Sequence, residues 1–339
     1  MMNANEISAI NELLATPKQI TIIPHRNPDG DAMGSTLGLY HFLKQLGHQA
    51  TVMAPNDFPD FLAWLPGSEN TLIYEKETER CQAQLNTSDL IFTLDFNALH
   101  RTGDQMGGFL ATLSKTFIMI DHHQWPDSYA KYIYSDTSMS STCEMVYHFI
   151  HFLEKQNLIN ETVATCIYTG LVTDTGSFRF ASTTSTTHEV AADLIKRGIK
   201  NAQIHNNLFD TSSYNRLQLL GKALQNMQLL EDYKTSYITL TQDELDAYQH
   251  KKGDTEGFVN YGLSIKGIDL TAIFIENKEE GIIKISFRSQ GDFDVNQFAR
   301  NYFNGGGHIN AAGGKSNLSL TETVNQFVTI VKETRNENS

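Results

Sequence analysis

The stretch that decides the fold starts at Gln19 and reads QITIIPHRNPDGDAMGS, ending at Ser35. Residues 19–24 form a short run rich in β-branched side chains, which favours a strand. Residues 34–46 carry apolar side chains at helical spacing and stop before Gly47, as a helix often does. Because a strand, a loop and a helix form the first half of a βαβ unit, we expect this stretch to open a parallel sheet.

The remainder of the first 200 residues repeats this alternation. Short apolar strands are expected at residues 50–53, 71–74, 90–94 and 116–120, with helical segments between most of them. Three consecutive helices are expected after them, over residues 140–153, 161–172 and 187–198. Strands that alternate with helices are typical of an α/β fold built on a parallel sheet. We therefore predict a parallel-sheet α/β domain over residues 1–200.

A second, smaller α/β domain is predicted over residues 215–335. The pattern favours one long helix over residues 214–230, then strands at 236–240, 270–275 and 282–287, and helices at 295–303 and 321–332. We place the boundary in a helix-rich connection at about residues 190–215. The length of 339 residues agrees with two domains, since a domain usually has about 100–200 residues.

The composition predicts a soluble globular protein that does not enter a membrane. Hydrophobic residues make up 40% of the chain and charged residues 19%, and no apolar run approaches the ~20 residues of a membrane span. The N-terminus has no basic start followed by an apolar stretch, and Cys81, Cys143 and Cys166 are scattered, so we expect a cytoplasmic protein. The net charge of -13 argues against binding long duplex nucleic acid, which needs a basic surface.

Acidic and imidazole side chains follow three of the predicted strands and one of the predicted helices. They are His25, Asp29, Asp31, Asp95, Asp121, His122, His123 and Asp174. Open α/β sheets place their ligands at the carboxyl ends of their strands. Each member alone has an ordinary explanation, such as a turn at Asp29, a helix cap at Asp31 or Asp95, and a surface turn at residues 121–123. Their coincidence at one sheet edge favours a metal site.

The chemistry of such a cluster requires cations. Several carboxylates within a few ångströms cannot all stay ionised unless cations or protons neutralise them. Imidazole and carboxylate ligands without a thiolate suit Mn²⁺, Mg²⁺, Fe²⁺ or Zn²⁺. The number of ligands suits two ions that share one bridging carboxylate, and two ions ~3.5–4 Å apart can activate water and clamp a phosphoryl group.

The order of these residues resembles the signature motifs of the DHH phosphoesterase superfamily, and in particular bacterial nanoRNases that also act on 3′-phosphoadenosine-5′-phosphate (pAp). The segment from Gly305 to Gly314, GGGHINAAGG, resembles the glycine-rich motif of the DHH-associated C-terminal domain. The resemblance covers nearly the whole chain. It implies two divalent ions, with Mn²⁺ favoured and Mg²⁺ as the alternative.

The resemblance also implies roles for individual residues. One ion would be held by His25, Asp29 and Asp95, and the other by Asp31, Asp95, His122 and Asp174, with Asp95 as the bridge. His123 would stabilise the charge that develops on the phosphate. Asp121 would orient the two histidines without itself binding a metal ion.

In the second domain, the resemblance implies contacts to the substrate's phosphate and sugar, across a cleft from the metals. The residues concerned are Arg288, Ser289, Gly306, Gly307 and His308. A glycine run allows close approach of the backbone to an anion, and an arginine suits bidentate contact with phosphate. Arg101 has two alternative roles that the sequence does not distinguish: contact with a substrate phosphate, or a surface salt bridge.

The expected function is metal-dependent hydrolysis of phosphate esters. The substrates implied are short oligoribonucleotides, released as mononucleotides, and pAp, converted to AMP and phosphate. The alternatives are a linear or cyclic dinucleotide phosphodiesterase, a pyrophosphatase, and a non-catalytic regulator that binds RNA or nucleotides. The glycine-rich segment argues against the pyrophosphatase, and the complete ligand set argues against the regulator. The sequence leaves the oligomeric state open, a homodimer included.

Overall fold

The computed structural model describes residues 2–336, which form two compact units with the division between residues 211 and 212. The first unit is built on a six-stranded sheet in the order β3-β2-β1-β4-β5-β6, with every neighbouring pair parallel. Its strands are β1 (Gln19–Ile23), β2 (Gln49–Ala54), β3 (Leu72–Ile73), β4 (Leu90–Leu94), β5 (Thr116–Asp121) and β6 (Tyr132–Ser135). The predicted α/β fold class is confirmed, and β6 is a strand that the sequence pattern did not reveal.

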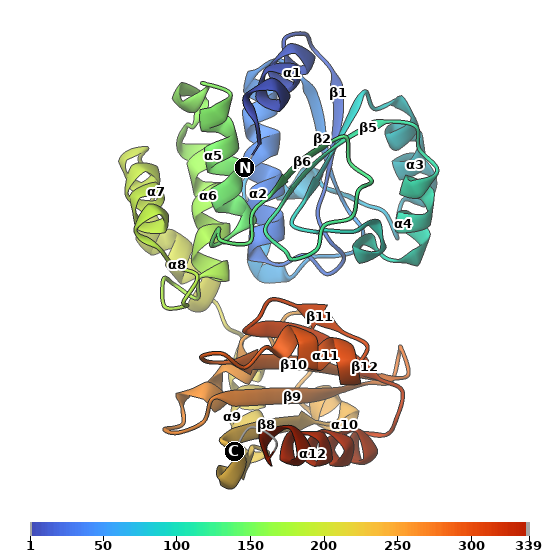
Figure 1. Cartoon of the computed structure of the whole chain (residues 1–339), viewed down its shortest axis with the longest axis vertical. Helices are drawn as coiled ribbons and strands as arrows, with labels where there is room; N and C mark the ends of the chain where they lie inside the picture. Colours follow the sequence, from blue (N-terminus) through green and yellow to red (C-terminus); the bar gives the residue numbers. More distant parts are fainter. Residues whose placement is uncertain (1, 337–339) are drawn as a thin grey trace. The chain divides into compact units, whose positions relative to one another are not determined.

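Helices cover both faces of this sheet (Figure 1). One face carries α1 (Ala4–Leu14), α2 (Gly30–Gln45), α5 (Thr142–Phe152) and α6 (Glu161–Asp174), with α7 (Ser185–Lys196) and α8 (Asn201–Phe209) beyond them. The other face carries α3 (Thr78–Thr87) and α4 (Asp104–Ala111). Successive side chains alternate between these layers, so Ile22 packs with α2, α5 and α6 while Ile23 packs with α3 and α4. A parallel sheet needs both faces covered, which explains its continuous apolar strands.

The helix α2 begins at Gly30, whereas the sequence pattern placed its start at Gly34. Asp29 caps it: one carboxylate oxygen accepts hydrogen bonds from the amides of Asp31 and Ala32, both at 3.0 Å. The apolar pattern missed this first turn because it contains Gly30, which packs closely against α6. A Cβ at Gly30 would lie 2.4 Å from the hydroxyl oxygen of Thr173 in α6. Asp31 therefore lies in the first turn of a helix, and not in a loop.

The second unit has a mixed sheet in the order β11-β12-β10-β9-β8-β7, in which β8 and β9 are parallel and the other neighbours antiparallel. Its strands are β7 (Gln228–Leu230), β8 (Thr235–Leu240), β9 (Leu270–Asn277), β10 (Ile282–Ser289), β11 (Gly306–Gly307) and β12 (Ala311–Ser316). One face packs against α11 (Val295–Tyr302) and α12 (Leu320–Asn336), and the other against α9 (Tyr214–Gln225) and α10 (Gln242–Ala247).

The prediction of one helix over residues 214–230 is wrong. The helix α9 ends at Gln225, and residues 228–230 form the edge strand β7 against β8. Asn226 ends the helix, and its side-chain amide donates to the carbonyl oxygen of Thr239 at 2.8 Å. The apolar spacing runs on past this point because Met227 and Leu230 pack against the two cores of the unit.

Candidate metal centre

The carboxyl ends of β1, β4 and β5 lie side by side in the sheet. The register pairs Ile23 with Thr93 and Leu94 with Ile120, so the three strands end at the same level. His25 follows β1, Asp95 follows β4 directly, and β5 ends in Asp121. The first turn of α2 and the last residue of α6, Asp174, complete the cluster. The structure thus brings the predicted acidic and imidazole residues together.

Asp95 occupies the centre of the cluster. Its Oδ2 atom lies 3.4 Å from His25 Nε2, and its Oδ1 atom lies 3.5 Å from His122 Nε2. The side chain is buried, and the backbone is in the left-handed region with φ of 65°. Non-glycine residues in that region are strained and concentrate at functional sites. A carboxylate with one oxygen toward each histidine has the arrangement that a bridging ligand needs.

Two sets of ligand atoms flank this carboxylate. In the first set, the ligand atoms of His25, Asp29 and Asp95 all lie within 4.8 Å of one another. In the second set, His122 Nε2 lies 3.8 Å from Asp31 Oδ2 and 3.4 Å from Asp174 Oδ2. Metal–ligand bonds of about 2.0–2.2 Å place two ligands of one ion within roughly 4.4 Å of each other. These residues therefore fit the binding of divalent metal ions.

Electrostatics in the cluster also favour a cation. Burial, together with the negative charges of Asp95 and Asp174, holds the pKa of Asp31 well above its usual range. Burial opposes ionisation of Asp95 as well, but hydrogen bonds from His122 and His25 outweigh it and keep the pKa of Asp95 well below its usual range. Burial lowers the pKa of His122, yet Asp95 and Asp174 raise it well above its ordinary value. The cluster thus holds protons where metal ions would otherwise supply positive charge.

Two of the histidine rings are oriented by backbone carbonyl oxygens. His25 Nδ1 donates to the carbonyl oxygen of Arg26 at 2.9 Å, and His122 Nδ1 donates to that of Met139 at 3.2 Å. A ring that donates from Nδ1 to a carbonyl presents Nε2 to a metal ion, which is the usual support of a histidine ligand. In both residues it is Nε2 that faces the carboxylates.

Asp121 fixes the position of His123. Its side chain is fully buried; Oδ2 accepts from the His123 amide at 3.1 Å and Oδ1 from His123 Nδ1 at 2.7 Å. From the sequence, we expected Asp121 to orient both neighbouring histidines. His122 has Met139 as its support, 17 residues along the chain, so the two rings are held by different groups.

The first turn of α5 also belongs to the site, which the residue pattern alone did not indicate. The amides of Thr142 and Cys143 donate to Asp31 Oδ2 at 2.7 Å and Oδ1 at 2.8 Å. The Thr142 hydroxyl donates to Asp95 Oδ1 at 3.0 Å. A signal was present, because Ser141 followed by Glu144 has the spacing of a helix N-terminus, where free amides favour carboxylates.

Arg101 lies in the short 3-10 helix η3 (Leu99–Thr102). Its positive charge acts against a net rise in the pKa of His25: burial lowers that pKa, but Asp95 and Asp29 outweigh burial and raise it. Its carbonyl oxygen accepts a hydrogen bond from the Arg26 amide at 2.8 Å. Its contact with a phosphate stays a prediction.

In the second unit, the glycine-rich segment is a hairpin and not a loop. Gly306 and Gly307 form β11 and pair with Gly313 and Ala312 of β12. The Gly307 amide donates to Asn296 Oδ1 at 3.0 Å, so this amide holds the hairpin to α11. His308 closes the turn, its amide donating to the carbonyl oxygen of Ala311 at 2.7 Å.

Arg288 and Ser289 end β10 beside this hairpin, where Arg288 pairs with Ala311. The Ser289 hydroxyl is buried; it donates to the carbonyl oxygen of Phe293 at 2.6 Å and accepts from Asn310 at 2.9 Å. It therefore ties neighbouring loops together. Arg288 is half-buried, and its guanidinium donates to the Phe287 carbonyl oxygen at 2.9 Å.

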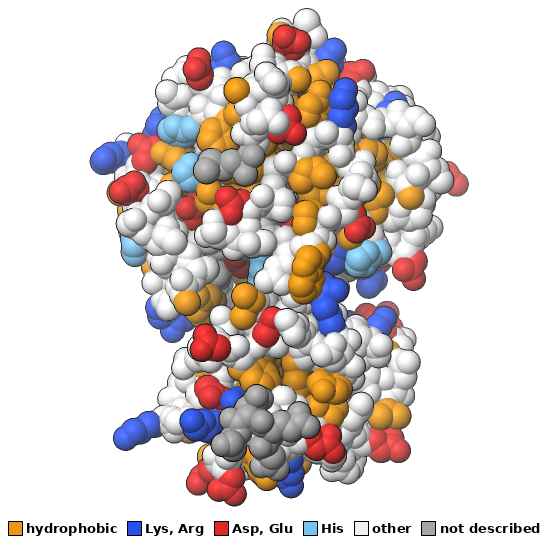
Figure 2. Space-filling view, viewed as in Figure 1, with side chains coloured by type: hydrophobic (Ala, Val, Ile, Leu, Met, Phe, Trp, Pro, Cys, Tyr) orange, Lys and Arg blue, Asp and Glu red, His pale blue; other side chains and the backbone are white. Residues whose placement is uncertain are grey.

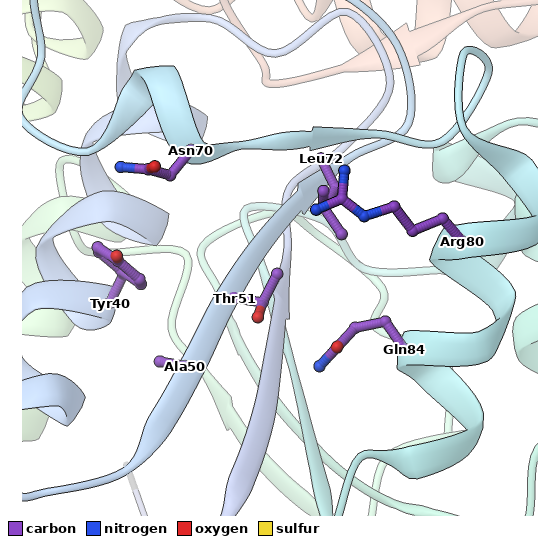
Figure 3. Close-up of a pocket in the computed structure, with 7 residues that line it drawn as sticks. All are labelled: Tyr40, Ala50, Thr51, Asn70, Leu72, Arg80 and Gln84. Atoms are coloured by element: carbon purple, nitrogen blue, oxygen red, sulfur yellow. The ribbon is translucent and has the colours of Figure 1, made fainter.

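A cavity of about 260 Å³ lies elsewhere in the first unit, on the edge formed by β2 and β3 (Figure 3). Its lining residues are Tyr40, Ala50, Thr51, Asn70, Leu72, Arg80 and Gln84. None of them belongs to the cluster described above, and we assign this cavity no part in the chemistry.

The fold and this centre together define a phosphoesterase of the DHH type. Residues 19–171 match the DHH family, N-terminal domain, and residues 235–337 match the DHHA1 domain. The chain belongs to the DHH family of phosphoesterases, as its motifs indicated.

Two relatives that are similar over most of the chain have the same name. The bifunctional oligoribonuclease and PAP phosphatase NrnA of Thermus thermophilus is 33% identical over 324 residues, which cover 95% of this chain and 91% of the relative. The protein of the same name from Bacillus subtilis is 31% identical over 296 residues, covering 86% and 88%.

Solved structures agree on the fold. An exopolyphosphatase-related protein from Bacteroides fragilis superposes with a TM-score of 0.93 and 38% identity, covering 98% of this chain and 97% of that one. RecJ of Thermus thermophilus in complex with Mn²⁺ reaches a TM-score of 0.55 at 14% identity, over 97% of this chain and 54% of RecJ, and shares the fold. Among the described residues, no helix is both long and apolar enough to cross a membrane.

Proposed function

We propose that this protein hydrolyses short oligoribonucleotides to mononucleotides and pAp to AMP and phosphate. The observation that carries the proposal is the position of Asp95 between two sets of imidazole and carboxylate ligands. The similarity to two relatives named as bifunctional oligoribonuclease and PAP phosphatase extends over most of the chain and supports this choice of substrates.

The cofactors in this proposal are two divalent ions, Mn²⁺ in preference to Mg²⁺. His25, Asp29 and Asp95 would hold one ion, and Asp95, Asp31, His122 and Asp174 would hold the other. Bound there, the ions would supply an activated water and positive charge for the phosphoryl oxygens.

The chain's own residues orient the reacting phosphate. Asp121 accepts a hydrogen bond from His123 Nδ1, and in the imidazolium form of the ring the second N–H, on Nε2, is the donor assigned to a phosphate oxygen. A donor held in place before the reaction stabilises the charge that develops in the transition state. Arg101, in the short helix η3 that follows Asp95, is assigned to contact with a substrate phosphate.

The second unit is assigned to the part of the substrate that does not react. Arg288 and His308 contact its phosphate and sugar, and the hairpin glycines Gly306 and Gly307 allow the backbone to approach. Ser289 belongs to the same end of β10, although its hydroxyl already has two internal partners.

Short substrates and a cytoplasmic location complete the proposal. On the face in Figure 2, the described Lys and Arg side chains are scattered among Asp and Glu and do not merge into a continuous basic track. With a net charge of -13, such a surface disfavours a long strand or duplex. Cys81, Cys143 and Cys166 are free and buried, which suits a reducing compartment.

A substrate panel tests this function. The purified protein is freed of metal with EDTA and assayed with Mn²⁺ or Mg²⁺ on pAp, RNA of two to twenty nucleotides, pyrophosphate, and linear and cyclic dinucleotides. We expect activity on pAp and the shortest RNAs, lost on chelation and restored best by Mn²⁺. Full activity in EDTA, or hydrolysis of pyrophosphate alone, would overturn the proposal.

A further inference from the structure

The first turn of α5 contacts two of the carboxylates assigned to the metals. Thr142 is fully buried; its amide donates to Asp31 Oδ2 at 2.7 Å and its hydroxyl to Asp95 Oδ1 at 3.0 Å. One residue therefore joins the central carboxylate to a ligand from another element. The Cys143 amide adds a second bond to Asp31, so both oxygens of that carboxylate are held.

The hydroxyl contact distinguishes the two oxygens of Asp95. Oδ1, which Thr142 holds, is the oxygen near His122, whereas Oδ2 faces His25. A carboxylate attached through rotatable bonds can exchange its oxygens unless a donor fixes the rotation. Because the backbone of Asp95 is strained, its surroundings must hold it in place.

The turn that carries Thr142 is itself anchored from its other side. The Ser141 hydroxyl accepts from the Glu144 amide at 3.0 Å and caps the helix. The buried carboxylate of Glu144 accepts from the Ser140 amide at 3.2 Å and from the Thr187 hydroxyl at 3.1 Å, in the first turn of α7. These bonds make the start of α5 a rigid support.

We propose that Thr142 is a positioning residue that sets the rotation of Asp95 for the binding of both metal ions. The inference rests on the proposed two-metal function. The hydroxyl orders Asp95 before any cation arrives, so metal binding at either site costs less reorganisation. Loss of a hydrogen-bond partner behind a metal ligand reduces metal affinity by about 10–100-fold.

The test measures Mn²⁺ binding directly, by isothermal titration calorimetry on metal-free protein. Thr142→Val removes the hydroxyl and keeps both the side-chain shape and the amide, while Thr142→Ser keeps the hydroxyl. The matched control is Thr21→Val, which removes an equally buried hydroxyl of the same unit, bonded to Ser88 Oγ at 2.7 Å. Melting temperatures without metal report on folding.

We expect Thr142→Val to weaken Mn²⁺ binding about 10–100-fold at one or both sites, while Thr142→Ser and Thr21→Val stay close to wild type. Thr142→Ala serves in its place if the valine variant does not fold. Wild-type Mn²⁺ affinity in Thr142→Val, or in Thr142→Ala where alanine replaces valine, would overturn the inference. So would a Thr142→Ser variant that binds Mn²⁺ as weakly as Thr142→Val. A wild-type protein that binds fewer than two ions would instead refute the two-metal function, so the two failures are distinguishable.

Discussion

Replacing Asp95 by asparagine should be the most damaging single change in the metal centre. Asparagine preserves the size of the side chain and tolerates the left-handed backbone better than most residues, so the change removes charge without adding strain. The comparison is Asp29→Asn. Asp29 uses Oδ1 to cap α2 and presents Oδ2 to His25, and asparagine caps a helix as well as aspartate does.

The contacts determine the expected size of the effect. Asp95 faces two histidines, one on each side, and serves both proposed ions, whereas Asp29 serves one. A charge-assisted interaction is worth roughly 1.5–3 kcal/mol. Two such losses amount to roughly 3–6 kcal/mol, and each 1.36 kcal/mol is a factor of ten. Asp95→Asn should therefore lower kcat/KM by about 10²–10⁴-fold, and Asp29→Asn by about 10–10²-fold.

The assay is steady-state hydrolysis of pAp in Mn²⁺, with bound metal measured on the same preparations. Circular dichroism and melting temperature establish that both variants are folded. We expect Asp95→Asn to retain less metal than Asp29→Asn. If Asp95→Asn kept more activity than Asp29→Asn, Asp95 would not be the bridge.

Three further outcomes are expected. Arg288→Ala and His308→Ala should raise KM about ten- to a hundredfold, because both residues contact the part of the substrate that does not react. The value of kcat should fall less, and the metal content should not change. Steady-state kinetics with metal analysis checks this, and an unchanged KM on both pAp and a dinucleotide would refute it. The rate per RNA end should fall steeply from two to twenty nucleotides, and comparable rates would indicate a processive exonuclease. Burial disfavours ionisation of Glu144, but the nearby His148 imidazole and hydrogen bonds from Ser140 and Thr187 outweigh burial and lower the pKa of Glu144 from the ordinary 4.5. The ionised form therefore stabilises the fold above that pH and stops doing so as pH falls through the lowered pKa. Glu144→Gln should have a lower melting temperature than wild type at pH 7, and this difference in melting temperature should become smaller below pH 4.5. A difference that does not depend on pH would contradict this.

Local patterns were sufficient to locate most of the strands and the residues at their ends. The run at residues 90–94 coincides with β4, and the apolar stretch before Asp121 coincides with β5 apart from its last residue. The apolar pattern gave the wrong element where side chains with helical spacing pack inward from a segment that is not a helix. Met227 and Leu230 continue a helical stripe because both pack inward, although the chain has already left α9 for an edge strand.

The sequence by itself determined the parallel sheet, the carboxyl ends where the chemistry gathers and the identity of the acidic and imidazole residues there. Each of these follows from short apolar runs, helical spacing and turn residues within short windows, because parallel strands that alternate with helices place their carboxyl ends at one edge. Only the tertiary structure decided what supports those residues. Thr142 reaches Asp31 from 111 residues away, because α5 packs against α2 and so brings its first amides to that carboxylate. Such a contact depends on how helices pack, and no periodicity in the sequence encodes it.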